Sequence, residues 1–160
     1  MNKYDEGMAL LAEKFGNHKD NLIALATIAK EPSAGGNPRP IVRDVDAYYE
    51  DGVFYVVTYG QSNKMQEIAK NPEVAIAVSG QWFNGSAIGE NLGWCLKPEN
   101  AALRDKLRKA FEAWYDFANN EKDENCCYLA IRMTSGVINI DHFKKLYFMD
   151  FANKTATVKE

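Results

Sequence analysis

The chain has 160 residues, 46% of them hydrophobic, which suits one folded domain over residues 1–160 with a substantial core and excludes disorder throughout. Its net charge of −3, without a basic stripe, argues against a nucleic-acid partner. No apolar run could span a bilayer, and the polar N-terminus matches neither a signal nor a transit peptide, so we expect a cytoplasmic protein without a membrane partner.

The first part of the chain predicts a helix, a strand and a loop. Residues 1–20 are expected to form an N-terminal helix and a lead-in, with the helix over 5–15. Residues 21–29 are an almost uninterrupted apolar run, for which a strand buried on both faces fits best and a helix is the alternative. Residues 30–38 hold two prolines and two glycines and are expected to form a loop. The apolar face of the helix consists of Met8, Leu11, Ala12 and Phe15.

A β-hairpin is predicted next. Residues 38–49 form its first strand, 50–52 its turn, and 53–58 the antiparallel return strand. Alternation places Arg43 on the opposite face from Val42 and Asp44. Arg43 is either an anion ligand or half of an exposed salt bridge with a nearby aspartate, Asp44 or Asp46, and the residues alone favour the salt bridge.

A short helix is expected over residues 63–70. Ser62 or Asn63 would be its N-cap, and Gln66 completes a capping box with Asn63. Lys64 then lies in the first turn, where its charge opposes the helix dipole at a cost of ~0.3–1 kcal/mol that a bound anion would remove. From spacing alone, a phosphate site and a solvated lysine are equally good interpretations, because no glycine-rich phosphate motif is present.

The middle of the chain predicts two strands and the longest helix. The apolar run 74–78 is typical of a central strand, and the strand over 81–89 is expected to bend at Gly85 and Gly89. Trp82 and Phe83 should point to opposite faces, one into the core and the other to an interface. A long peripheral helix is expected over 98–118. Its solvent-exposed face is expected to hold the charged residues Arg104, Asp105, Lys106, Arg108 and Lys109. Its apolar stripe is Leu103, Leu107, Ala110, Phe111, Trp114 and Phe117.

The C-terminal part predicts strands over 126–133, 137–140 and 145–151, followed by a tail that is either an edge strand or a frayed end. We count six or seven strands, mostly in hairpins, with helices at the periphery. This pattern favours a mainly β fold, a single closed or partly split antiparallel barrel.

Residues suited to catalysis or metal binding are scarce. The two histidines, His18 and His142, form no triad pattern and no metal-ligand spacing, so we predict no metal site. Cys95, Cys126 and Cys127 have no Cys-x-x-Cys spacing and are expected to be reduced, buried thiols. If the protein is an enzyme, a cofactor carries its chemistry.

Four segments in order resemble one known family. They are Pro40-Ile-Val-Arg43, Asp51-Gly52-Val-Phe-Tyr-Val-Val-Thr58, Ser62-Asn-Lys64 and Asn71-Pro72-Glu-Val74. Together they resemble the pyridoxamine 5′-phosphate oxidase family of FMN-binding split β-barrels, above all its small general stress and nitroimidazole-resistance-type members. The resemblance covers residues 22–133, and each segment is weakly specific alone.

The resemblance implies a homodimer that holds FMN at the subunit interface. It assigns Arg43, Ser62 and Lys64 to the flavin phosphate, Thr58 to the ribityl chain, and the backbone of Val42 to Asp44 to the ring. Arg39 is the alternative phosphate-binding arginine, and Asn63 stands where many relatives hold a basic residue. The resemblance implies no catalytic residue.

Two hypotheses of function follow from this resemblance, and a third assumes that the protein binds no cofactor. The first is an FMN-dependent oxidoreductase that uses NAD(P)H or a small-molecule acceptor. Its substrate is not expected to be pyridoxamine phosphate, because the oxidases' C-terminal Arg-x-His is replaced by Ile140-Asp141-His142. The alternative is a non-catalytic flavin- or haem-binding stress protein, with His142 as the candidate haem ligand. The third is a ligand-free barrel that serves as a dimeric interaction module.

Overall fold

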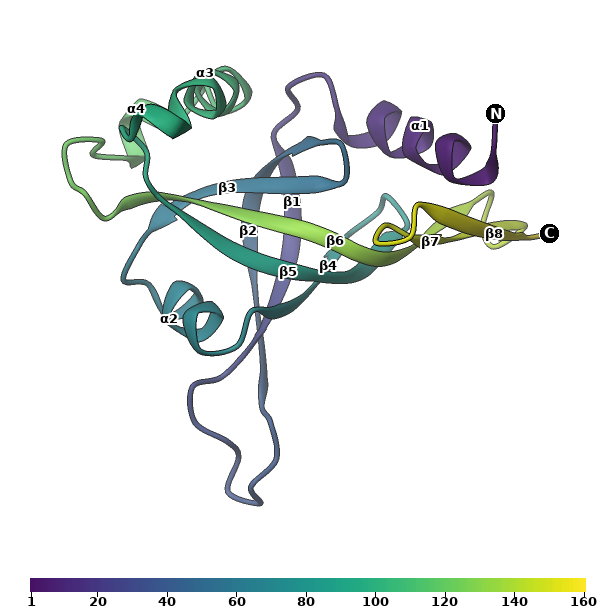
Figure 1. Cartoon of the computed structure of the whole chain (residues 1–160), viewed down its shortest axis with the longest axis horizontal. Helices are drawn as coiled ribbons and strands as arrows, with labels where there is room; N and C mark the ends of the chain where they lie inside the picture. Colours follow the sequence, from purple (N-terminus) through teal and green to yellow (C-terminus); the bar gives the residue numbers. More distant parts are fainter.

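The structure is a computed structural model that describes residues 1–160. Eight strands and a few helices make up the chain (Figure 1). In order they are α1 (Lys3–Phe15), β1 (Asn21–Ile28), β2 (Pro40–Glu50), β3 (Val53–Tyr59), α2 (Asn63–Lys70), β4 (Glu73–Val78), β5 (Phe83–Trp94), the 3-10 turn η1 (Pro98–Asn100), α3 (Ala101–Ala110), α4 (Tyr115–Ala118), β6 (Cys126–Ile140), β7 (Lys145–Asp150) and β8 (Thr155–Lys159).

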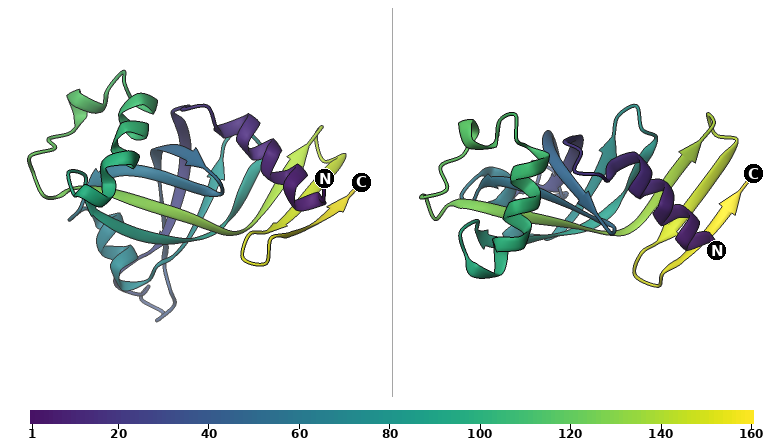
Figure 2. Two further views of the ribbon diagram at one scale, coloured as in Figure 1. Left: turned by 45° about the horizontal axis from the view of Figure 1, so that its top comes forward. Right: turned by 90° about the horizontal axis from the view of Figure 1, so that it is seen from above.

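Six of the strands form a closed antiparallel barrel, which confirms the predicted fold class. Their order is β3-β2-β1-β4-β5-β6, and pairing of β3 with β6 closes the ring. The chain has eight strands, against six or seven expected. Two strands expected separately, 126–133 and 137–140, form the single long strand β6, and the tail forms the edge strand β8. Strands β7 and β8 extend the sheet beyond the barrel, at the end where α1 and both termini lie (Figure 2).

The barrel interior is filled by alternate residues of its strands and by α1. Leu11 and Phe15 of α1 are fully buried, and the Phe15 ring packs against Phe54 and Phe83 at about 5.7–5.8 Å between centroids. Each such side chain contributes roughly 1.5–3 kcal/mol through burial. Leu11 and Phe15 of the predicted helix face are therefore in the core, whereas Ala12, predicted on the same face, is exposed. Phe83 has its predicted core position, and Trp82 lies at the surface.

The prediction that β1 is buried on both faces is wrong, and β4 likewise alternates between buried and exposed residues. A closed antiparallel barrel has one face inside and one outside, so only every second residue enters the core. The outward residues are nevertheless small or apolar, and Leu22 and Val42 are 59% and 66% exposed. We call this surface the outer face; it comprises Leu22, Ala24, Ala26, Val42, Ala75 and Ala77.

The glycines of β5 have different roles. The predicted bend at Gly85 is confirmed by a bulge at the next two residues, where β5 lies so close to β6 that a side chain would meet the Ser135 carbonyl. Gly89 is not a bulge, contrary to the prediction; it makes room for Ile68 of α2. The second bulge ends at Gly93, whose φ of +79° suits glycine.

The predicted helix over 98–118 is broken into η1, α3 and α4. Leu107, Phe111 and Tyr115 bury into a second core against Tyr128, which pulls the chain inward between α3 and α4. Phe117, expected in the apolar stripe, is instead 95% exposed. Charged residues of α3 expected in solvent form ion pairs, such as Arg104 with Glu121 at 2.6 Å. Every helix here is too short or too polar to cross a membrane.

Candidate anion-binding site at the start of α2

Helix α2 begins and ends where the sequence predicts, but its cap differs. Ser62 has the backbone conformation of an N-cap, and Met65 and Ile68 bury the apolar face of the helix. The predicted capping box is wrong, because Gln66 Oε1 accepts from Lys30 Nζ instead of from a backbone N–H at the helix start, and Gln66 Nε2 donates to the Gln61 carbonyl. The free N–H groups of the first turn therefore have no side-chain acceptor.

Lys64 is half-buried at this helix start rather than solvated. Its Nζ donates to Thr58 Oγ1 at 2.8 Å, and no carboxylate lies within ion-pair distance of it. Burial, and to a smaller extent the positive charge of Arg43, lowers the pKa of the Lys64 ammonium below its ordinary value. The protein therefore holds a destabilised cation at the positive end of a helix, an arrangement that a bound anion would relieve.

Ser62 adds a second feature of the same kind. Its Oγ is buried and has no hydrogen-bond partner. A buried hydroxyl without a partner costs about 1–3 kcal/mol, so such groups in folded proteins call for an explanation. An acceptor oxygen between Ser62 and Lys64 would satisfy both side chains.

Arg43 does not form the salt bridge expected from the sequence. Its guanidinium donates to Glu67 of α2 at 2.8 Å and to Thr27 of β1 at 2.6 Å, rather than to Asp44 or Asp46. The Glu67 side chain is 3% exposed, so this ion pair lies largely inside the protein. Arg43 thus already has a carboxylate partner, and less of its charge is free for a ligand than the resemblance implies.

A small cavity lies beside this ion pair, between α2 and the base of the β1–β2 loop. It has a volume of about 250 Å³, and the predicted residues Arg39, Arg43 and Asn63 line it. Lys30 lines it as well, and the carboxylates of Glu31 and Glu67 oppose the three cations. The residues fit an anionic group at this end of α2, with positive charge in slight excess.

The eight predicted site residues fall into three sets. Thr58 and Lys64 are hydrogen-bonded at the start of α2, where Ser62 is the N-cap, and Arg39, Arg43 and Asn63 line the adjoining cavity. Val42 and Asp44 instead point away from both, on the exposed side of β2.

Sequence reasoning missed two members of the site, Thr27 and Glu67. Thr27 was the available signal, since it is the one hydroxyl-bearing residue in the apolar run 22–29. The largest cavity of the protein, about 560 Å³, lies elsewhere and contains none of the eight predicted residues.

Comparison by sequence finds nothing: no protein-family model and no curated protein matches the chain. Comparison with solved structures does find matches. A pyridoxamine 5′-phosphate oxidase-related, FMN-binding protein from Nostoc punctiforme PCC 73102 has a TM-score of 0.62 at 15% identity, over 99% of this chain and 96% of that one. General Stress Protein 26 from Bacillus anthracis str. Sterne has a TM-score of 0.56 at 19% identity, over 79% and 91%.

A heme binding protein from Mycobacterium smegmatis also shares the fold, with a TM-score of 0.62 at 14% identity, over 89% of this chain and 58% of that one. A NimC/NimA family protein and a FAD-binding protein are among the further matches. At these identities the likeness shows the fold. The resemblance seen in the sequence is confirmed to that extent: the chain has the split-barrel fold of pyridoxamine 5′-phosphate oxidase-related proteins.

Proposed function

We propose that the protein binds FMN, with the flavin phosphate at the start of α2, and that it is an FMN-dependent oxidoreductase. The observation that carries the proposal is the half-buried Lys64, with its lowered pKa, beside the unpartnered hydroxyl of Ser62. The fold supports it, since the Nostoc punctiforme protein that shares this fold binds FMN.

Each predicted residue has a role that its position supports. Lys64 and Ser62 would bind the phosphate oxygens, and the Thr58 hydroxyl, now held by Lys64 Nζ, would turn to the ribityl chain. Arg43, Arg39 and Asn63 would add positive charge and polar contacts from the cavity next to Lys64. The backbone of Val42 to Asp44 would lie against the ring, on the outer face.

The outer face also suits self-association. We propose a homodimer that buries Leu22 and Val42. In the single chain these two large apolar side chains are exposed to water. Such a dimer would bring the residues 42–44 of each subunit close to the other subunit, as an interfacial cofactor requires. We further propose that the protein works in the cytoplasm.

Bound FMN would supply the two-electron redox chemistry, with NAD(P)H or a small molecule as the partner in electron transfer. The chain's own part is to hold the phosphate and to keep water from the ring. Pyridoxamine phosphate is not the proposed substrate, because Ile140-Asp141-His142 replaces the expected Arg-x-His and His142 lies exposed in a turn.

The test is a titration of FMN into the purified apoprotein, in which binding is measured by the quenching of flavin fluorescence. Lys64→Ala should weaken FMN binding at least tenfold, because it removes a cation from a partly desolvated site. Lys109→Ala is the matched control, since Lys109 is also a helical lysine but is exposed and lacks contacts with the site. Equal affinity in the Lys64 variant and the wild type would refute the phosphate site.

The same preparation separates the alternatives. Solved structures with this fold include a FAD-binding and a heme binding protein, so FAD and hemin are titrated beside FMN. Tightest binding of FMN supports the proposal, and tightest binding of hemin, lost in His142→Ala, would replace it. Bleaching of the bound flavin by NADH or NADPH then distinguishes an enzyme from a non-catalytic flavin carrier.

A further inference from the structure

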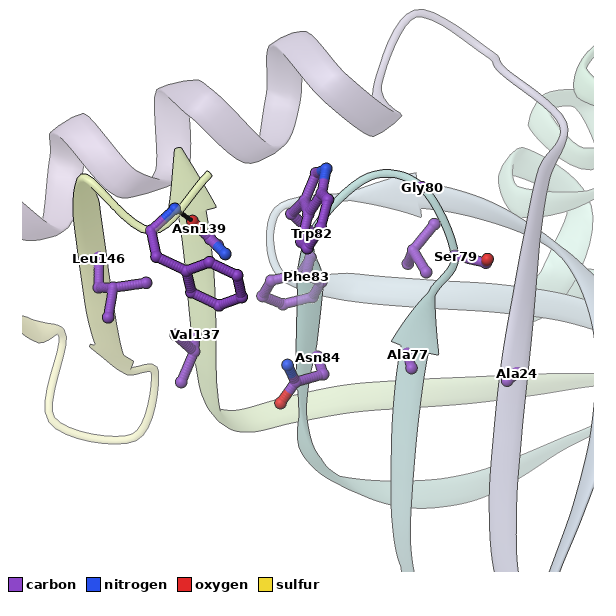
Figure 3. Close-up of a pocket in the computed structure, with 12 residues that line it drawn as sticks. Ala24, Ala77, Ser79, Gly80, Trp82, Phe83, Asn84, Val137, Asn139 and Leu146 are labelled. Atoms are coloured by element: carbon purple, nitrogen blue, oxygen red, sulfur yellow. Dashed lines mark hydrogen bonds between the residues drawn. The ribbon is translucent and has the colours of Figure 1, made fainter. Parts of the chain in front are cut away.

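A second, larger cavity shares no lining residue with the one beside Arg43. Figure 3 shows it between the turn that joins β4 to β5 and the turn that joins β6 to β7. Its volume is about 560 Å³, within the range of small-molecule sites. No charged side chain lines it; the walls include Trp82, Phe83, Val137, Phe143 and Leu146.

Three polar side chains line this cavity, Ser79, Asn84 and Asn139, and of these only Asn139 is buried. Asn139 is only 7% exposed, and its Oδ1 accepts a hydrogen bond from the Phe143 N–H at 2.7 Å. That bond fixes the orientation of the amide, so the Nδ2 donor is the atom that faces the cavity, as Figure 3 shows. Nδ2 makes no hydrogen bond within the protein, so it is available as a donor to a ligand in the cavity.

The aromatic walls are tied to this same asparagine. The backbone N–H of Asn139 donates to the Trp82 carbonyl at 2.9 Å, and its side chain holds Phe143. Trp82 and Phe143 have positive φ angles of 57° and 71° and remain 46% and 66% exposed, with their rings edge to face at 5.6 Å. Large residues with a positive φ angle are uncommon, and strained backbone conformations of this kind are concentrated at functional sites.

We propose that this cavity is a second binding site, for a neutral planar ring compound that carries a carbonyl oxygen, such as a quinone. The ring would pack against Trp82 and Phe143, and the oxygen would accept the free hydrogen bond of Asn139 Nδ2. The absence of charged lining residues selects a neutral compound over a phosphate-bearing one. Its lining includes Ala24 and Ala77 of the outer face, so the site borders the surface that the proposed homodimer would bury.

Duroquinone is the probe, because its fully substituted ring does not add to thiols and the chain has three cysteines. Binding to the flavin-free protein is measured by quenching of tryptophan fluorescence. Asn139→Asp keeps the oxygen that holds Phe143 and replaces the donor by an acceptor, so it should weaken binding about tenfold or more. Trp82→Ala should also weaken binding. Because this variant lacks the tryptophan of the cavity, its binding is measured by the NMR shifts of the Leu146 and Val137 methyl groups. The control Phe117→Ala removes an exposed aromatic outside the cavity and should leave binding unchanged.

A second readout covers the case in which Asn139→Asp does not fold. In the wild type, the side-chain amide signals of Asn139 should shift on addition of duroquinone, in step with the fluorescence change. Amide signals that stay in place while the quinone binds would overturn the assignment. Displacement of duroquinone by FMN would do so as well, since the cavity would then be part of the flavin site.

Discussion

Glu67 changes the electrostatics of the anion site more than any other residue. Its carboxylate lies 2.8 Å from the Arg43 guanidinium and is almost completely buried, so it neutralises the cation that the sequence resemblance assigns to the phosphate. An anion that approaches Arg43 must compete with this internal carboxylate. The binding energy for a phosphate therefore depends mainly on Lys64 and Ser62.

Replacement of Glu67 by glutamine should separate ligand affinity from stability. Glu67→Gln keeps a hydrogen-bonding side chain beside Arg43 but removes the negative charge, so the affinity for FMN should rise about tenfold, or about 1.4 kcal/mol. The free energy of unfolding should fall by about 1–3 kcal/mol, because Arg43 loses its buried counter-ion. Fluorescence titration and urea unfolding measure the two effects.

Riboflavin, which lacks the phosphate, is the control ligand for this variant. Its affinity should be the same in the wild type and in Glu67→Gln. A parallel gain for riboflavin and FMN would show that Glu67 acts on the ring or on the fold rather than on the phosphate.

Asp46 gives a pH-dependent prediction. Burial, and then the neighbouring Asp20 carboxyl, raises the pKa of Asp46 from 3.8 to about 6. Between pH 3.8 and about 6, Asp46 is therefore more protonated in the folded state than in the unfolded state. The free energy of unfolding falls as the pH rises through this range, because the folded state must then hold a charged, partly buried carboxylate. Asp46→Asn should raise the free energy of unfolding by about 1 kcal/mol at pH 7.5, after allowance for solvent screening.

The gain in Asp46→Asn should shrink toward zero at pH 4, where the wild-type carboxyl is largely protonated. Urea unfolding at a series of pH values measures the difference between the two proteins. A gain of the same size at all pH values would mean that the asparagine stabilises the fold by some other contact.

At the residue scale, the sequence predicted features that depend on local order. Lys64 follows Ser62 in one helical turn, so their proximity can be read from spacing, and Thr58 precedes them by one short connection. Glu67 was not predicted, because its contact with Arg43 depends on how α2 packs across two strands of the barrel. The donor of Asn139 depends in the same way on two turns that are far apart in the sequence.

At the scale of elements, the region between η1 and α4 shows how packing overrides helical periodicity. The sequence predicts one continuous helix whose apolar stripe includes both Phe111 and Phe117. The observed break lets Phe111 stack on Trp114 at 4.7 Å, while the Trp114 indole N–H donates to Asp20 at 2.7 Å. These contacts bind the segment to the barrel and leave Phe117 in solvent.

The broken helix predicts opposite outcomes for two phenylalanines. Phe111→Ala should lower the free energy of unfolding by about 3–5 kcal/mol, because it opens a cavity in the second core. Phe117→Ala should change it by less than about 0.5 kcal/mol, since the side chain is exposed. Urea denaturation measures both, and similar losses would mean that the helix is continuous in solution.

The strands were easier to predict than their burial. The alternation in β2 and the turn at residues 50–52 gave the correct hairpin. The runs in β1 and β4 are apolar on both sides, so periodicity could not show which residues face outward. Only the closure of the barrel decides this.

At the scale of the whole molecule, the outer face predicts the oligomeric state. The proposed homodimer would have twice the 18.0 kDa mass of the chain. Leu22→Asp places a charge in this face, at a position that is 59% exposed in the single chain, and should yield a folded monomer in analytical ultracentrifugation. Phe117→Asp is the control at a distant exposed apolar residue. A wild-type protein that sediments as a monomer would contradict the proposal.

The fold as a whole was predictable because several hairpins and a family-like order of segments agree. The number of strands could not be predicted from the sequence. Thr134-Ser135-Gly136 suggests a break between two strands, but β6 continues through it because β5 and β7 pair with it on both sides. The position of α1, which packs against β2, β7 and β8, likewise depends on long-range contacts.

The pairing of β3 with β6 has a consequence for how the chain is made. Residues 53–59 leave the ribosome well before their partners at 126–132, so β3 has one edge without a neighbour throughout that interval. Long-range closure of this kind folds slowly, and an open edge can pair with other chains. Pausing translation before residue 126 should therefore expose the nascent chain to aggregation, and chaperones would be needed most at that stage.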